Sequence, residues 1–136
     1  KFDGRDSELP REKWLPATSA NVTKSTRIME RTPLFLGTDW EMALRVAHKM
    51  EPPPDVIFFM SDGSGGNSPP PILSINRTHG KPQINTLAMQ TTAGAKEFSE
   101  IAKKTGGTFN LIDKRGKPIK GEDYFKDPKK YARDLN

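Results

Sequence analysis

The chain has 136 residues, of which 33% are apolar and 29% are charged, a length and balance that fit one domain with a modest core. The absence of cysteine excludes disulfide scaffolds, thiol nucleophiles and Cys-ligated metal sites. No apolar run approaches the roughly 18 residues of a membrane helix, so we expect a soluble chain, whose compartment the sequence does not specify.

The net charge of +5 is concentrated near the end of the chain. Residues 114–136 hold 8 basic and 4 acidic groups, whereas residues 1–113 are nearly balanced. A polar segment with such an excess is usually a solvated end segment. We therefore predict a basic tail over 114–136 and no nucleic-acid partner.

The first elements in chain order are a loop and two helices. Residues 1–18 contain two prolines and predict a loop or a poor edge strand. Apolar positions at helical spacing from Ser19 predict a helix that ends near Arg31. Thr38 and Glu41 form a capping box, which predicts Thr38 as the N-cap of a helix over 39–50. Its expected buried stripe is Trp40, Ala43, Leu44, Ala47 and Met50.

The most apolar segment follows the prolines at 52–54. Residues 55–61 (Asp-Val-Ile-Phe-Phe-Met-Ser) form a continuous run of strand length. A run of this kind is typical of a central parallel strand that is buried on both faces. We therefore expect this strand in the middle of the sheet.

The second half alternates helices and strands. We expect a glycine-rich loop over 62–69, a short helix over 70–76 and strands over 84–89 and 108–112, with a helix over 94–105 between these two strands. The alternation predicts an α/β fold: a Rossmann-like, doubly wound, mostly parallel sheet with helices on both faces, formed by residues 1–113. The expected core comprises Leu44, Phe58, Phe59, Leu87, Phe98, Ile101 and Phe109.

Asp62 is the strongest candidate for chemistry, because it directly follows the most apolar strand. Ligands of open parallel sheets bind beyond the carboxyl ends of the strands, and a carboxylate there could hold a small hard cation. The alternative is an Asp that only closes a turn. We expect His48 and His79 to be solvated surface residues, and no base is suitably spaced from a nucleophile, so we predict no enzyme activity.

The chain resembles the later part of a von Willebrand factor A (vWA) domain. The residues that carry the resemblance are Gly37-Thr38-Asp39 at a helix start, Pro54 to Gly63 across the apolar strand, Ile84 to Met89, Phe98 to Ala102, and Thr105 to Phe109. They occur in the order and at the spacing of that family, over roughly residues 14 to 112.

The resemblance implies a Mg²⁺-dependent adhesion site. Thr38 and Asp62 match two positions that hold Mg²⁺ directly or through water in that family, and Ser61, Gly63 and Ser64 would lie beside a protein partner. A carboxylate of that partner would complete the metal site, as suits the oxygen ligands that Mg²⁺ takes.

The family's principal ligand motif, Asp-x-Ser-x-Ser, does not occur after any apolar run of the chain. Either the native protein is longer and this sequence is a fragment, or the site has decayed; we expect a fragment. We expect this chain alone to bind Mg²⁺ at best weakly. Removal of the first strand would also expose the edge of residues 56–60, so we predict that this edge is covered by a second copy, a swapped element or upstream residues.

The leading functional hypothesis is a vWA-like protein-binding module for adhesion or assembly, with a Mg²⁺ site that is incomplete in this chain. The alternative is a structural or assembly domain without metal-dependent binding. A phosphate- or nucleotide-handling enzyme ranks last, because the chain has no glycine fingerprint for phosphate and no base.

Overall fold

The computed structural model describes residues 14–31, 39–63 and 68–135. Six helices are present in this part of the chain: α1 (Ser19–Arg31), α2 (Trp40–His48), α3 (Pro69–Thr78), α4 (Ala95–Lys104), α5 (Gly121–Lys126) and α6 (Pro128–Leu135). Four strands accompany them: β1 (Val56–Ser61), β2 (Gln83–Met89), β3 (Phe109–Ile112) and β4 (Pro118–Lys120).

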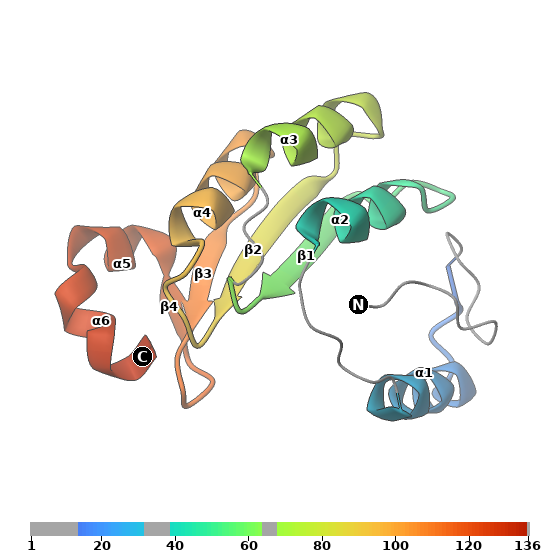
Figure 1. Cartoon of the computed structure of the whole chain (residues 1–136). Coiled ribbons are helices and arrows are strands. Elements are labelled where there is room, and N and C mark those ends of the chain that lie inside the picture. Colours follow the sequence, from blue (N-terminus) through green and yellow to red (C-terminus); the bar gives the residue numbers. More distant parts are fainter. Residues whose placement is uncertain (1–13, 32–38, 64–67, 136) are drawn as a thin grey trace.

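The strands form one mixed sheet in the order β1-β2-β3-β4 (Figure 1). The β1–β2 and β2–β3 pairs are parallel, as expected, whereas β4 pairs antiparallel with β3. The fold is therefore α/β. In this sheet β2 has a neighbour on both sides, while β1 lies at an edge.

The position of β1 corrects the prediction of a central strand buried on both faces. Its residues alternate between half-buried and exposed, and β2 is the strand with continuous burial. Within the described ranges β2 is the only strand that pairs with β1, so none of these residues covers its outer edge. Cover by a second copy or a further segment stays a prediction.

The core lies on one face of the sheet, between the strands and α2, α3 and α4. The register places Phe59 beside Thr86, and Thr86 beside Phe109, on this covered face. The Trp40 ring of α2 stacks on the Phe98 ring of α4 at 4.6 Å and meets the Phe59 ring edge-on at 5.6 Å. These aromatic contacts fasten two helices to the sheet.

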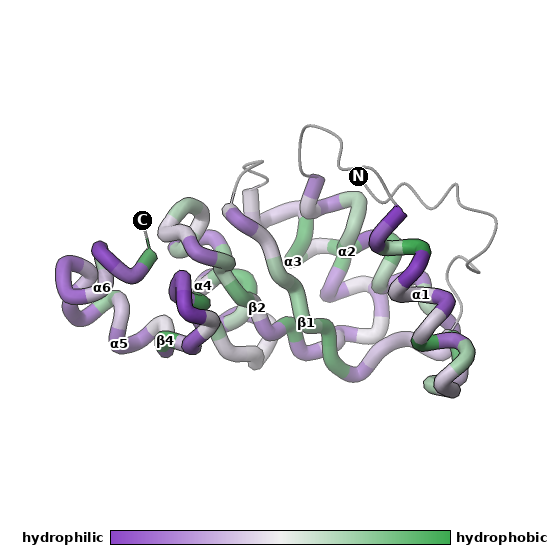
Figure 2. The backbone as a smooth tube through the Cα atoms, turned by 90° about the horizontal axis from the view of Figure 1, so that it is seen from below, coloured by the Kyte–Doolittle hydropathy of each residue, from purple (hydrophilic) through white to green (hydrophobic). Residues whose placement is uncertain are grey.

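The opposite face of β1 is open. Val56, Phe58 and Met60 are 42%, 71% and 60% exposed, so Phe58 does not belong to the core, contrary to expectation, and Leu87 is only half-buried. The expected helices on both faces are thus not found over β1 in the described part of the chain. Figure 2 shows how strongly apolar this strand is compared with α5 and α6.

The interpretation of residues 114–136 as a solvated tail is wrong. This segment adds β4 to the sheet, and α5 contacts β3 and β4. Leu135 of α6 is fully buried in the core, and Arg115 bonds to the Asp134 carboxylate at 3.1 Å. A few well-placed apolar residues are enough to fold a segment that is basic on average.

The helix at the start of the described chain matches its prediction. The Thr18 hydroxyl accepts a hydrogen bond from the Asn21 N–H at 3.2 Å, which is the geometry of an N-cap for α1. Among the described residues, no helix has both the length and the apolar character needed to cross a membrane.

Candidate functional site

The carboxyl ends of β1 and β2 meet at one edge of the sheet. Ser61 ends β1, Asp62 follows it as an exposed residue, and Gly63 is buried behind it. The loop after β2 and the start of α4 lie against the same place, because Gly63 approaches Ala93 closely. Thr38 and Ser64, the other two candidate site residues, lie outside the described residues.

Gly63 locks the Asp62 loop onto the loop that precedes α4. Its φ of +76° is left-handed, and a Cβ at this position would lie 2.0 Å from the Ala93 carbonyl oxygen. Only glycine permits this backbone-to-backbone approach. A Cβ on Gly94 would in turn lie 2.9 Å from the Trp40 ring, so the start of α4 is wedged against α2.

Ser61 stabilises the same loop from within. Its Oγ accepts a hydrogen bond from the Gly63 N–H at 3.3 Å, a short side-chain-to-backbone bond that closes a turn. The side chain is half-buried. The hydroxyl therefore helps to shape the loop in which Asp62, an exposed residue, lies.

The N-cap of α2 is Asp39, not Thr38 as the capping box predicted. The Asp39 carboxylate accepts a hydrogen bond from the Met42 N–H at 3.0 Å, and Asp39 has extended backbone angles. An acidic side chain at a helix start also complements the helix dipole. The role expected of Thr38 in capping is thus taken by the next residue.

The residues described at this edge fall short of a magnesium site. No group of three or more His, Asp or Glu side chains within ranges 14–31, 39–63 and 68–135 is arranged to hold a metal ion. Mg²⁺ takes six oxygens, and the edge offers the Asp62 carboxylate beside the Ser61 hydroxyl. Further ligands would have to come from water, from a partner or from residues outside these ranges.

His48 was expected at the surface, but it is buried between α2 and α3. Its Nδ1 lies 2.6 Å from the Leu44 carbonyl oxygen, and its Nε2 lies 2.9 Å from Oδ1 of Asn76. The side chain thus links α2 to α3, which is a structural role. A signal existed, because His48 falls four and eight residues after Leu44 and Trp40, on the stripe that packs inward.

The rest of the expected α2 stripe is only partly correct. Trp40 and Leu44 are buried, whereas Ala43 is exposed and Ala47 and Met50 are half-buried. The buried face therefore follows an i, i+4, i+8 pattern. His79, in contrast, is exposed at the end of α3, as predicted.

Comparison with known proteins gives no match: no protein-family model fits the sequence, and no significant relative is found among curated proteins or solved structures. The resemblance to vWA domains therefore rests on the residues quoted for it and on the α/β architecture.

Proposed function

We propose that this chain forms part of a Rossmann-like, protein-binding α/β domain of the vWA type. The recognition edge is the carboxyl end of β1 and β2, with Asp62 as a ligand of Mg²⁺ and Thr38 as a second contributor. Ser61, Gly63 and Ser64 flank the partner. The function is binding, for adhesion or assembly, rather than catalysis.

The observation that carries the proposal is the locked Asp62 loop. Ala93 lies so close to Gly63 that an added Cβ would be 2.0 Å from its carbonyl oxygen, and the Gly63 N–H donates to Ser61 Oγ at 3.3 Å; both contacts support the backbone beside the exposed residue Asp62. A supported backbone beside a carboxylate favours a cation-dependent contact, since Mg²⁺ demands near-ideal geometry. A merely solvated Asp needs no such support.

The open side of β1 supports the same reading. Gln83 N–H donates to the Asp55 carbonyl at 2.9 Å, so alternate residues of β1 direct their main-chain groups toward β2. Val56, Phe58 and Met60 direct theirs toward the outer edge. Three residues, rather than all five from 56 to 60, thus offer N–H and C=O groups to a further strand, which could bring the remaining metal ligands.

The second candidate function is a structural or assembly domain without a metal. The exposed apolar side chains of Val56, Phe58 and Met60 favour it, because contiguous apolar patches on a surface mark interfaces. In that case the edge of β1 would serve association, including self-association, and Asp62 would have no ligand role.

Calorimetric titration of Mg²⁺ and Mn²⁺ into the native protein separates the two functions. We expect saturable heat from the parent protein and from an Asp55→Ala control, which removes an exposed carboxylate at the opposite end of β1. The Asp62→Ala variant should lose that heat. Equal heats from the parent and Asp62→Ala would leave the assembly function as the better account.

A further inference from the structure

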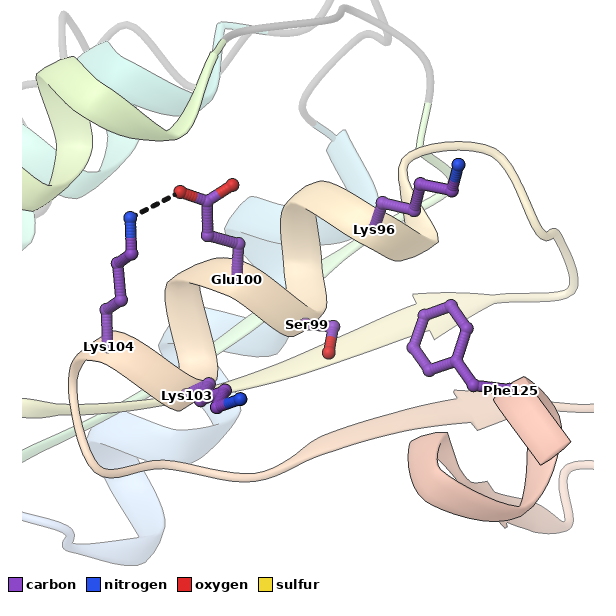
Figure 3. Close-up of a pocket in the computed structure, with 6 residues that line it drawn as sticks. All are labelled: Lys96, Ser99, Glu100, Lys103, Lys104 and Phe125. Atoms are coloured by element: carbon purple, nitrogen blue, oxygen red, sulfur yellow. Dashed lines mark hydrogen bonds and ion pairs between the residues drawn. The ribbon is translucent and has the colours of Figure 1, made fainter.

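A groove of about 620 Å³ runs between α4 and α5 (Figure 3). Its lining combines three lysines with an aromatic ring. The residues are Lys96, Ser99, Glu100, Lys103, Lys104 and Phe125.

The charges of the groove do not cancel. Glu100 and Lys104 form an ion pair at 2.7 Å, so the charges of these two side chains cancel. Lys96 and Lys103 make no ion pair with any described residue. Glu97 also lies on α4, and Asp123 of α5 pairs with Lys126 at 3.7 Å. Two ammonium groups are left to meet an outside anion.

The spacing of residues along α4 sets the distance between the two lysines. Lys96, Ser99 and Lys103 occupy positions i, i+3 and i+7, which lie on one side of a helix. At a rise of 1.5 Å per residue, the two lysines stand roughly 10 Å apart along the axis. A segment in the polyproline II conformation covers about the same span in three residues, and its residues i and i+3 lie on one side.

An apolar wall completes the groove. Phe125 is 41% exposed and projects from α5 toward α4 beside Ser99 (Figure 3). The inner side of its ring is anchored by Phe109, with the ring centroids 6.0 Å apart. The ring is therefore held in place and offers its outer side to a ligand.

We propose that this groove binds a short acidic segment of a protein partner, in which two carboxylates about three residues apart flank an apolar side chain. The carboxylates pair with Lys96 and Lys103, Ser99 donates its hydroxyl between them, and the apolar side chain packs on Phe125. That the partner is a protein rests on the proposed binding function. Binding in the groove itself does not require a metal.

A peptide fits these observations better than a nucleic acid. Nucleic-acid binding usually involves several phosphate contacts along a continuous basic surface. Of the three lysines that line this groove, two lack an ion pair with a described residue, and Glu100 lies within the groove itself. A ligand with two separated negative charges matches this pattern, and a longer polyanion does not.

Fluorescence anisotropy tests the proposal with a labelled peptide, Gly-Ser-Glu-Leu-Ser-Glu-Gly-Ser, at about 50 mM salt. The whole 136-residue chain should bind it, and the Lys96→Glu/Lys103→Glu variant should bind about tenfold more weakly. The matched control is Lys24→Glu/Lys129→Glu, which changes the net charge equally at two exposed lysines outside the groove. It should lose much less, and circular dichroism should show all three proteins folded.

Two further ligands decide between the outcomes. A peptide with Gln in place of both Glu residues should not bind, and a single-stranded uridine 12-mer should bind no more tightly than the acidic peptide. Equal losses in both double variants, or tighter binding of the RNA, would overturn the proposal. All measurements include EDTA and are repeated with Asp62→Ala, so a failed metal site leaves this result unchanged.

Discussion

The two faces of β1 differ sharply in how far their side chains are exposed. Ile57 and Phe59 pack into the core, while Val56, Phe58 and Met60, which alternate with them, face away from it and are exposed. The neighbouring strand β2 contains fewer apolar residues and is nevertheless better buried. Burial in this sheet therefore follows from neighbours and register, and not from the local density of apolar residues.

The largest expected effect concerns the place where β1 is locked to the rest of the molecule. Gly63→Ala adds a Cβ 2.0 Å from a carbonyl oxygen at a left-handed residue, so the loop or α4 must move. We expect the left-handed backbone angle to cost about 1 to 2 kcal/mol and the steric clash to cost about 1 to 3 kcal/mol more. Urea denaturation measures the sum as a loss in the free energy of unfolding.

The control for this substitution is Gly116→Ala. Gly116 has a φ of +77° with nothing within 4 Å of an added Cβ, so only the cost of the backbone angle remains. Equal losses at the two glycines would show that the Gly63 loop is not locked against Ala93.

Adjacent phenylalanines test the contrast between the faces directly. Phe59→Ala removes a ring that contacts Trp40 and Phe98 at 5.6 Å each, and should lower the free energy of unfolding by about 3 kcal/mol. Phe58→Ala, on the open face, should change it by about 0.5 kcal/mol or less. The two faces would be equivalent, contrary to this structure, if both substitutions destabilised the chain to the same extent.

A polar cluster on the face of β2 that points away from the core extends the comparison to a second strand. Asn85 is buried, and its Oδ1 accepts hydrogen bonds from the Thr108 N–H and hydroxyl, both at 2.9 Å. Asn85→Ala should cost about 1 to 3 kcal/mol in thermal or urea unfolding, because the Thr108 groups lose their acceptor.

Gln83→Ala is the matched change for this cluster. Gln83 Nε2 donates to the same Asn85 oxygen at 3.2 Å, but its side chain is exposed, so water can replace the bond. We expect a change of about 0.5 kcal/mol or less. If Gln83→Ala lowered the free energy of unfolding as much as Asn85→Ala, the bond from Gln83, and not the bonds from Thr108, would be the one that stabilises this cluster.

The smallest expected effect is a pH dependence beyond β3. Asp113 accepts hydrogen bonds from the Lys117 N–H at 2.7 Å and the Arg115 N–H at 2.8 Å, and these bonds lower its pKa despite the opposing effect of burial. A lowered pKa in the folded state stabilises the fold above the ordinary carboxyl pKa of about 3.9. The stabilisation is lost as the pH falls through the folded pKa.

The measurement is the free energy of unfolding of the parent chain and of Asp113→Asn between pH 6 and pH 2. The parent should be the more stable protein at pH 6, and the difference should shrink toward pH 2. A constant difference across this range would show that the Asp113 charge is not what holds the turn.

The sequence predicted the elements well and their surroundings less well. Pro33 and the prolines at 52–54 mark helix ends, and the helices and strands expected between residues 19 and 112 all form at nearly the expected positions. Strand 56–61 was misplaced because its apolar run says nothing about which neighbours it has. The approach of Gly63 to Ala93 joins residues 30 apart, and no local pattern reveals it.

The end of the chain shows the same limit. Residues 114–135 are basic on average, yet Ile119 packs against the core because β4 turns back onto β3, and Leu135 of α6 is buried in the core. Of the candidate site, the sequence indicated Asp62 and its loop, whose role stays a prediction, and the structure adds the close contact of Gly63 with Ala93. The positions of Thr38 and Ser64 lie outside the described residues, so their place beside Asp62 stays a prediction.

Residue-resolved hydrogen exchange of the dilute chain is the most direct test of the central claim, that β1 is paired on one side only. The amides of Ile57 and Phe59 should be protected, because they face β2, while those of Val56, Phe58 and Met60 should exchange rapidly. Protection of all five amides would contradict the account, since it would mean that another strand already covers the edge.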